Sequence, residues 1–237
     1  EIAGLKRHLL CLDRQSGELQ WQSTVSAVHP EDAYQGFITE HGYASSTPVS
    51  DGEVIVSFFG KAGVVAHDMQ GRQLWQTDIG KQSGTRLWGS AGSPVLAGNV
   101  VIINASDESL SIRGLDKSSG KEIWKAEAKG LENTFCTPLL TSVAGRDEVV
   151  VSVPGEVWGL APASGKLLWY ASTATDGNIS PSPVLQGNTI FVMGGRRGST
   201  AAIRLGGTDD VTNSHLSWSS EASSYVPSPI VHEGYLY

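Results

Sequence analysis

The sequence has few cysteines, few charged residues and no long hydrophobic run, and each shortage excludes a class of protein. Its 237 residues include 2 cysteines, and only 17% are Asp, Glu, Lys or Arg, against roughly 25% in an average globular domain. Lys and Arg number 17 and Asp and Glu 24, a net charge of −7, which argues against a basic nucleic-acid-binding module. No apolar run approaches the roughly 18 residues of a membrane-spanning helix. We expect neither nucleic-acid binding nor direct membrane insertion from this chain.

The two cysteines, Cys11 and Cys136, each lie in an apolar run and not at metal-ligand spacing. Free cysteine behaves as a small buried hydrophobe, so two buried thiols are favoured over the alternative of a disulfide. The chain opens at Glu1 without a methionine and stops at Tyr237 inside an alternating apolar run. Both ends therefore predict a fragment of a longer chain, in which a signal peptide, an anchor or further domains lie outside these residues.

Two repeated markers are the strongest feature of the sequence. A small residue, a proline and an apolar residue recur at 46–49, 92–95, 136–139, 181–184 and 227–230, with the prolines spaced by 46, 44, 45 and 46 residues. Glycine and tryptophan, which are abundant at 28 and 7 residues, recur together in the same phase, four residues apart. Two independent markers with one period of about 45 residues indicate a structural repeat.

Each repeat has the pattern of a four-stranded antiparallel meander. A glycine turn such as Asp51-Gly52 follows the proline marker, and a β-branched run such as 100–103 follows the turn, which predicts a hairpin. A third run follows a short polar loop, and a fourth ends at the tryptophan. The proline stands at the start of the first strand, where a missing N–H costs least. No ten-residue stretch has a helical period of 3.6.

Sheets this small cannot bury both of their faces alone, and radial stacking as propeller blades solves that problem. We expect an all-β chain, a β-propeller of four-stranded antiparallel blades with four complete blades and two half blades. The expected boundaries are 44–78, 90–128, 134–173 and 179–222 for the complete blades, with outer strands at 5–26 and inner strands at 226–237.

The turn before each tryptophan carries a family resemblance. Residues 11–21 contain Asp13, Gly17 and Trp21, and the segment resembles the repeat of quinoprotein-like (PQQ-repeat, BamB-like) β-propellers, whose pattern is Ala-x-Asp-x-x-Thr-Gly-x-x-x-Trp. The second copy is one residue short in its turn, and the fourth has Ala161 in place of the aspartate. The fifth holds an insertion at 206–212. The resemblance implies a ring of seven or eight blades, with the inter-blade connections on one face. The alternative is that the two half blades pair with each other and close the ring as a fifth blade.

The residues of this motif have a structural explanation that needs no ligand. The aspartate accepts backbone N–H groups across the turn, the glycine takes a left-handed conformation, and the tryptophan wedges between blades. The residues to which we assign this structural role are Asp13, Gly17, Trp21, Asp68, Gly71, Trp75, Asp116, Gly120, Trp124, Gly165, Trp169 and Trp218.

Function in such folds usually lies in loops, and two inter-blade connections are expanded here. From tryptophan to the next marker proline the chain runs 27 and 19 residues in the first two connections, against 14, 14 and 11 in the others. The first is rich in aromatic and acidic residues, which makes it a candidate recognition surface, although a solvated insertion is an equal alternative. The binding candidates are Tyr34, Phe37, His41 and Tyr43 in the first connection, Arg86 and Trp88 in the second, and Arg196 and Arg197 as a positive patch.

Two other site types are weakly supported. The first connection contains metal-ligand residue types, but His29, Glu31, Asp32, Glu40 and His41 have no zinc-signature spacing. We therefore expect no metal site. The glycine-rich segment 194–200 precedes a strand-like run instead of a helix, so it lacks the helix start that binds phosphate.

The resemblance implies two kinds of function. In pyrroloquinoline-quinone (PQQ) dehydrogenases of the family, the quinone lies between a tryptophan and a vicinal disulfide, beside a Ca²⁺ ion and an aspartate base. This chain has no Cys-Cys pair, and the only candidates are Trp88 with Arg86, and Asp107 with Glu108, an acidic pair that is expected to be solvated. A hydrolase with acidic residues at the channel mouth has even less support.

The other members that the resemblance points to are non-catalytic. They include BamB-like scaffolds, which dock a partner protein outside the bacterial cytoplasm, and propellers attached to Ser/Thr kinases as sensors. Because no nucleophile-and-base motif is present, the sequence favours a scaffold with a protein partner and no cofactor, in a periplasmic or otherwise extracytoplasmic setting.

Overall fold

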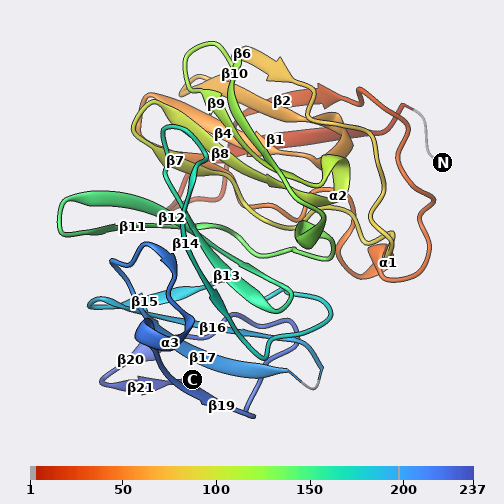
Figure 1. Ribbon diagram of the computed structural model, residues 1–237. Helices are drawn as coiled ribbons and strands as arrows, with labels where there is room; N and C mark the ends of the chain where they lie inside the picture. The colour runs from red at the N-terminus through yellow and green to blue at the C-terminus, as the bar shows by residue number, and fades with distance from the viewer. Residues whose placement is uncertain (1–3, 197) are drawn as a thin grey trace.

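Small antiparallel sheets follow one another along the chain, which is described by a computed structural model over residues 4–196 and 198–237 (Figure 1). The first complete sheet has the order β3-β4-β5-β6 and the second β7-β8-β9-β10. Their strands are β3 Val49–Ser50, β4 Val54–Phe58, β5 Val64–Asp68, β6 Gln73–Thr77, β7 Val95–Ala97, β8 Val100–Ala105, β9 Ser111–Asp116 and β10 Glu122–Glu127.

The third and fourth sheets repeat this meander with one addition. The third is β11 Leu139–Val143, β12 Arg146–Val153, β13 Glu156–Leu160 and β14 Leu167–Ser172, and the fourth is β15 Val184–Gln186, β16 Thr189–Gly194, β17 Ser199–Arg204 and β19 Leu216–Ser220. The insertion before β19 supplies β18 (Asp209–Asp210), which pairs in parallel with β14 of the preceding sheet. The insertion thus joins two neighbouring sheets.

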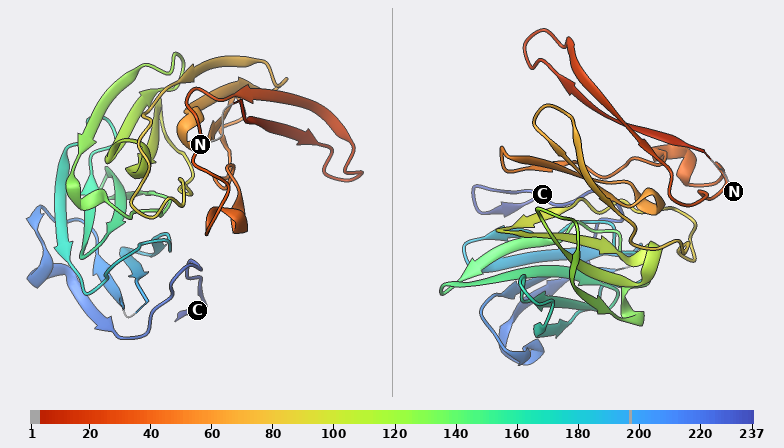
Figure 2. Two further views of the ribbon diagram at one scale, coloured as in Figure 1. Left: turned by 90° about the vertical axis from the view of Figure 1, so that its right-hand side faces the viewer. Right: turned by 90° about the horizontal axis from the view of Figure 1, so that it is seen from above.

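Two-stranded hairpins occupy the two ends of the described chain: β1 Lys6–Leu12 with β2 Leu19–Ser26, and β20 Val231–His232 with β21 Tyr235–Leu236. Figure 2 shows the sheets side by side in chain order around an arc. The first strands of successive sheets contact one another, β3 with β7, β7 with β11, and β15 with β20, so they lie innermost. The architecture is the predicted all-β propeller of four-stranded blades.

In the part of the chain that the structure describes, helical structure is confined to short segments between strands. These are α1 Ile38–His41, α2 Ser106–Ser109, α3 Thr212–His215 and the 3₁₀ turns Gly60–Ala62 and Lys129–Leu131. Within the described residues no helix is long and apolar enough to cross a membrane.

The hydroxyl residue before each marker proline links neighbouring blades near the axis. The backbone N–H of Thr47 donates to Ser93 Oγ at 2.9 Å, and that of Ser93 donates to Thr137 Oγ1 at 2.9 Å. The N–H of Thr137 donates to Ser182 Oγ at 3.0 Å, and that of Ser182 to Ser228 Oγ at 3.0 Å. The marker therefore holds a chain of equivalent hydrogen bonds that passes from blade to blade.

The tryptophan and glycine of the second marker link the blades at their outer side. Trp75 donates from Nε1 to the Lys117 carbonyl of the next blade at 2.9 Å. Gly120, in the same turn, has φ +70°, and a Cβ there would lie 2.5 Å from the Trp75 ring. Trp21 with Gly71 and Trp124 with Gly165 repeat the arrangement. Only glycine fits, because the indole lies directly on its Cα.

The aspartates of the same turns accept backbone hydrogen bonds. Asp13 Oδ1 accepts from the N–H groups of Gln15 at 2.9 Å and Ser16 at 2.8 Å, while Asp68 and Asp116 accept equivalent bonds in their own turns. These bonds lower the pKa of Asp13 below its ordinary value.

The last two tryptophans depart from this pattern. Trp169 is buried and donates to Glu148 Oε2 at 2.7 Å, inside its own sheet. Trp218 is 44% exposed and lies beside Phe191, with ring centroids 5.9 Å apart. Among the described residues no Asp-Gly turn follows Trp218 to cover it, since β20 and β21 form only an inner hairpin.

The apolar core forms as layers between adjacent sheets. One layer joins Val56, Phe58 and Trp75 to Val101 and Ile103 of the next sheet, and two further layers follow at the next two sheet interfaces. Both cysteines are free. Cys136 is buried in the second layer, whereas Cys11 is only partly buried, because it lies on the terminal hairpin, which has a neighbouring sheet on one side only.

Candidate functional site

Four of the five inter-blade connections, the first, second, third and fifth, bring aromatic rings together at one end of the sheets. Trp88 is central, because its ring centroid lies 4.7 Å from that of Phe37, 5.3 Å from Phe135 and 6.4 Å from Tyr225. Phe37 also contacts His41 edge-on at 5.8 Å. We call Phe37, Trp88, Phe135 and Tyr225 the aromatic cluster. The structure thus unites candidates from both expanded connections with two rings from short ones.

A cavity of about 350 Å³ opens beside the aromatic cluster. Its walls come from all five inter-blade connections and are mainly apolar and hydroxyl-bearing. They are Phe37, Glu40, His41, Ser45, Trp88, Gly89, Ala91, Phe135, Thr137, Ser180, Ser182, Val226 and Ser228. The lining therefore includes hydroxyl residues that join neighbouring blades by hydrogen bonds.

Two arginines lie near Tyr225, one over its ring and the other linked to it through Asn178. The Arg196 guanidinium lies 4.7 Å from the centroid of the Tyr225 ring, in cation–π geometry. Arg86 Nε donates to Asn178 Oδ1 at 3.1 Å, and Asn178 Nδ2 donates to the Tyr225 hydroxyl at 2.9 Å. Burial raises the pKa of Tyr225, but hydrogen bonds from Arg196 and Asn178 outweigh it and leave the pKa below its ordinary value. Arg197 lies outside the described residues.

The two tyrosines of the first connection have different surroundings. Tyr34 is 55% exposed, and its hydroxyl donates to the Thr39 carbonyl at 3.2 Å, which steadies α1. Tyr43 is half-buried and donates to the Asp32 carbonyl at 2.7 Å. Their rings lie 5.8 Å apart. Tyr43 is therefore part of a polar interior, and only Tyr34 faces solvent.

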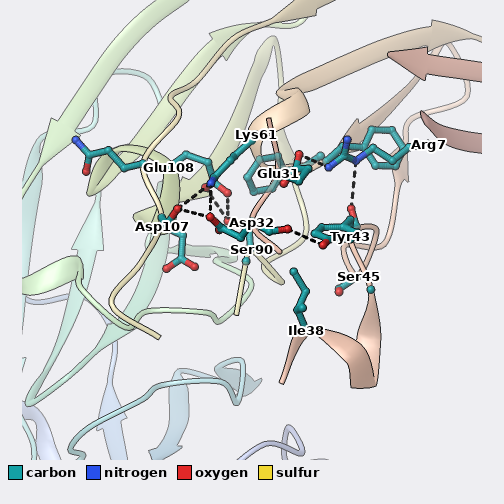
Figure 3. A pocket seen from close by; sticks show the side chains of 17 residues that line it. Arg7, Glu31, Asp32, Ile38, Tyr43, Ser45, Lys61, Ser90, Asp107 and Glu108 are labelled. Carbon is teal, nitrogen blue, oxygen red and sulfur yellow. Dashed lines mark hydrogen bonds and ion pairs between the residues drawn. The ribbon is translucent and has the colours of Figure 1, made fainter. Parts of the chain in front are cut away.

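Figure 3 shows that polar interior, which shares Ser45 and Gly89 with the cavity beside the aromatic cluster. Lys61 Nζ donates to Asp32 Oδ1 at 2.8 Å and to Ser83 Oγ at 2.7 Å. Buried Arg7 pairs with buried Glu31 and lies 5.9 Å from the Tyr43 ring centroid. We call Arg7, Glu31, Asp32, Lys61, Asp107 and Glu108 the polar cluster.

The acidic pair of α2 completes the polar cluster, and its expected solvation was wrong. Asp107 is 5% exposed and Glu108 2%. Glu108 accepts from Ser90 Oγ at 2.7 Å, and Asp107 Oδ2 has no hydrogen-bond partner among the described residues. Burial, with the neighbouring Glu108 charge, raises the pKa of Asp107 to about 8, and burial raises the pKa of Glu108 to about 7.

The second expanded connection covers this pair through glycines. A Cβ on Gly80 would lie 2.2 Å from the Glu108 carbonyl oxygen, and a Cβ on Gly84 would lie 2.3 Å from Asp107 Oδ1. Glycine alone permits the backbone to approach α2 so closely. The burial of Asp107 and Glu108 is not visible in the sequence around them, because the covering residues, Gly80 and Gly84, lie more than twenty positions earlier.

The polar cluster also holds the loops that carry the aromatic cluster. Asp32, bound to Lys61, stands five residues before Phe37, and Ser90, bound to Glu108, stands two residues after Trp88. Both expanded connections are thereby fastened to the propeller frame beside their aromatic residues.

The metal-ligand residue types of the first connection do not converge. His29 Nε2 lies 2.9 Å from Asp78 Oδ2, and His41 Nδ1 lies 2.6 Å from Ser45 Oγ, in different places. Glu31 and Asp32 are engaged by the cations of Arg7 and Lys61. Across residues 4–196 and 198–237, no three His, Cys, Asp or Glu side chains are grouped so that they could hold a metal ion.

The residues at Trp88 do not fit the quinone site that the sequence resemblance suggested. The indole is already stacked against Phe37 and Phe135, and the chain has no Cys-Cys pair to cover a quinone. Of the nearby acids, Asp32 is bound by Lys61 and Glu108 by the Ser90 hydroxyl. Burial raises the pKa of Asp107 to about 8 and so favours its protonated form, whereas Ca²⁺ requires ionised carboxylate oxygens.

Phe135, Asn178 and Tyr225 were missed by the sequence prediction because they belong to connections of ordinary length. One signal was present: Trp88, Phe135 and Tyr225 all stand three to six residues before a marker proline. An aromatic residue at that place in successive repeats lies near the inner strands, where neighbouring connections meet.

A family model, curated sequences and solved structures all show similarity between this chain and BamB proteins. The family model "Outer membrane protein assembly factor BamB" matches residues 6–237. BamB of Burkholderia pseudomallei is 27% identical over 78% of this chain and 44% of its own length. The glycerol dehydrogenase large subunit of Gluconobacter oxydans is 29% identical over 46% of this chain and 16% of its own.

Solved structures share the fold. BamB from Moraxella catarrhalis superposes with a TM-score of 0.66 at 18% identity, over 97% of this chain and 66% of that one. Quinohemoprotein alcohol dehydrogenase from Comamonas testosteroni gives 0.59 at 12% identity, over 85% of this chain and 39% of that one. The chain spans less than half the length of these curated relatives. Its motifs, its blades and the family match together show that the chain belongs to the BamB family of PQQ-like repeat β-propellers.

Proposed function

We propose that this propeller is a non-catalytic scaffold that binds a partner protein through the face formed by its inter-blade connections. The observation that carries the proposal is the aromatic cluster, which gathers one ring from each of four connections around a cavity. Aromatic residues and arginine are the residue types enriched at the energetic centres of protein interfaces. Both types are present here, on a frame held by repeated hydrogen bonds.

Membership of the BamB family supports both a protein partner and an extracytoplasmic compartment for this function. Relatives in Burkholderia pseudomallei and Xanthomonas campestris are named as outer membrane protein assembly factors. We extend that role to this chain as binding of a protein partner in the periplasm or another extracytoplasmic compartment.

The test compares two exposed apolar residues of similar exposure. Phe37, in the aromatic cluster, is 41% exposed, and Ile123, on the outer strand β10, is 49% exposed. The protein is immobilised, partners are captured from an extract of the source cells, and captured proteins are quantified by mass spectrometry. We expect Phe37→Ser to reduce capture of a specific partner roughly tenfold, the effect of losing one interface anchor. Ile123→Ser serves as the control. Unchanged capture by Phe37→Ser would reject the scaffold face.

A PQQ-dependent dehydrogenase is the alternative, because a glycerol dehydrogenase subunit is among the relatives. Titration with PQQ and Ca²⁺ is followed by tryptophan fluorescence and then by alcohol-dependent reduction of a dye. We expect no saturable quenching at micromolar quinone. One-to-one quenching with dye reduction would replace the scaffold proposal by a quinoprotein enzyme.

A further inference from the structure

We propose that the cavity beside Trp88 binds an acidic segment of the partner, with one large apolar side chain of that segment seated in the cavity and its carboxylates at Arg86 and Arg196. This inference rests on the proposed scaffold function and names the chemistry of the partner.

The seat for the apolar side chain is the cavity itself. Its volume of about 350 Å³ lies at the low end of the roughly 300–1,000 Å³ range of ligand pockets. Such a space is large enough for one large apolar side chain. Phe37, Trp88 and Phe135 contribute apolar walls, and Phe135 is only 6% exposed. A partner ring or branched aliphatic side chain would be desolvated there, which is the property of an interface anchor.

Positive charge lies near the cavity, around Tyr225, whose ring contacts Trp88. Arg86 and Arg196 are both exposed, and their contacts within the described chain are with neutral groups, Asn178 and the Tyr225 ring. Neither arginine lies within 4.0 Å of a carboxylate among the residues that the structure describes. Their charges are therefore available to a ligand. Arginine also binds carboxylates in bidentate geometry, which adds direction to the attraction.

The positive edge contrasts with the rest of the molecule. The whole chain has a net charge of −7, so an acidic partner would be repelled by most of its surface and attracted at this edge. Glu40, which comes from α1 on the first connection, also lines the cavity. We therefore expect the partner's acidic residues on the Tyr225 side of the anchored side chain. A protein segment supplies both the apolar anchor and the carboxylates at the required spacing.

The experiment uses three fluorescein-labelled nine-residue peptides and fluorescence anisotropy. The first has one phenylalanine between glutamates and aspartates, the second has lysines in place of the acids, and the third has serine in place of the phenylalanine. We expect the first to bind roughly tenfold more tightly than either of the others, with affinity that falls as salt is raised.

Charge variants locate the site. We expect a weakening of at least about fivefold in the binding of the first peptide by Arg86→Glu, and the same by Arg196→Glu. Each variant replaces an attractive charge contact with a repulsive one. Lys166→Glu, an exposed residue in the outer turn between β13 and β14, makes the same change in net charge and is expected to leave binding within about twofold. Arg196→Gln is a milder variant that removes charge without reversing it. Circular dichroism and thermal melting confirm that each variant is folded.

Three results would overturn the inference: equal binding of the lysine peptide, equal binding of the serine peptide, or equal weakening by Lys166→Glu and the two arginine variants. Failure of this inference and failure of the scaffold are separable. If no peptide discrimination is found but Phe37→Ser still abolishes partner capture, the acidic segment is rejected and the scaffold stands. If Phe37→Ser leaves capture unchanged, the scaffold itself is rejected.

Discussion

The buried acidic residue Glu108 should make the stability of this protein fall as pH rises, and Glu108→Gln should remove much of that fall. Glu108 is 2% exposed and accepts a hydrogen bond from Ser90 at 2.7 Å, which a glutamine oxygen can also accept. Glutamine has almost the same shape and never ionises. The variant therefore changes the charge at this position and little else.

The magnitude follows from the pKa of Glu108. Burial raises that pKa from 4.5 to about 7. Below pH 4.5 both the folded and the unfolded chain hold the proton, so the group adds no pH dependence. Between 4.5 and 7 the unfolded chain ionises first, which favours unfolding. At about 1.4 kcal/mol for each pKa unit, the free energy of unfolding should drop on the order of 3 kcal/mol across this window.

Neighbouring titratable groups change how the free energy of unfolding of each protein depends on pH. They do not change the sign of the stability difference between Glu108→Gln and the parent. Burial raises the pKa of Asp107 to about 8, so Asp107 extends the fall in stability to higher pH. Burial lowers the pKa of His67, which makes stability rise with pH near its unfolded value of 6.5 and opposes the fall. Both groups remain in the variant. Loss of the Glu108 charge also removes one cause of the raised pKa of Asp107, which adds to the expected gain at high pH.

The assay is urea unfolding of the parent and of Glu108→Gln at half-unit steps from pH 5 to pH 8.5. The variant should gain stability relative to the parent as pH rises, by on the order of 3 kcal/mol in total. Glu18→Gln, at an exposed position in the first Asp-Gly turn, is the control and should show no such gain. A flat difference between parent and Glu108→Gln, or a difference that falls with pH, would refute the assignment of a buried, raised-pKa carboxyl.

Three further predictions test the frame of the propeller. Trp75→Ala should lower the free energy of unfolding by about 3–5 kcal/mol, because it empties the space between two blades. Trp218→Ala, at a position 44% exposed, should lower it by less than half as much. Equal losses in urea unfolding would contradict this difference in packing. Gly120→Ala should lower the free energy of unfolding by more than about 2 kcal/mol, because φ is +70° and the new Cβ would lie 2.5 Å from the Trp75 ring. An unchanged melting temperature would show that the turn can shift to accept the methyl group. Iodoacetamide at pH 8 should modify Cys11 well before Cys136, since burial raises the pKa of Cys136 to about 12; mass spectrometry that finds Cys136 labelled first would reject its burial.

The repeat could be predicted from the sequence because each marker has a local physical cause. Gly120 must be glycine where the Trp75 ring lies on its Cα, and Asp116 closes the same turn by accepting backbone hydrogen bonds. Such requirements recur whenever the blade recurs, so they leave a period in the sequence. One detail was hidden: the proline marks the first strand, but the inter-blade hydrogen bond is made by the hydroxyl residue before it, as at Ser93.

The candidate site was predicted only in part, since it depends on contacts between repeats. The long connections pointed to Phe37 and Trp88, because loop length is visible in the sequence. The burial of Glu108 was not visible, because it requires Gly80 to bring a separate connection within van der Waals distance. Tyr225 was likewise invisible, since a single tyrosine in a short connection acquires meaning only when Trp88 lies beside it.

The frame and the site use different residues of the same repeat, and this division explains how the site can be specialised. The blades are joined by backbone N–H groups that donate to Ser or Thr before the marker proline, and by indoles that lie on glycines. Neither link involves the middle of an inter-blade connection. The connections can therefore change in length and residue type without loss of the frame. Substitutions at Phe37 should accordingly alter binding much more than stability, whereas substitutions at Gly120 should do the reverse.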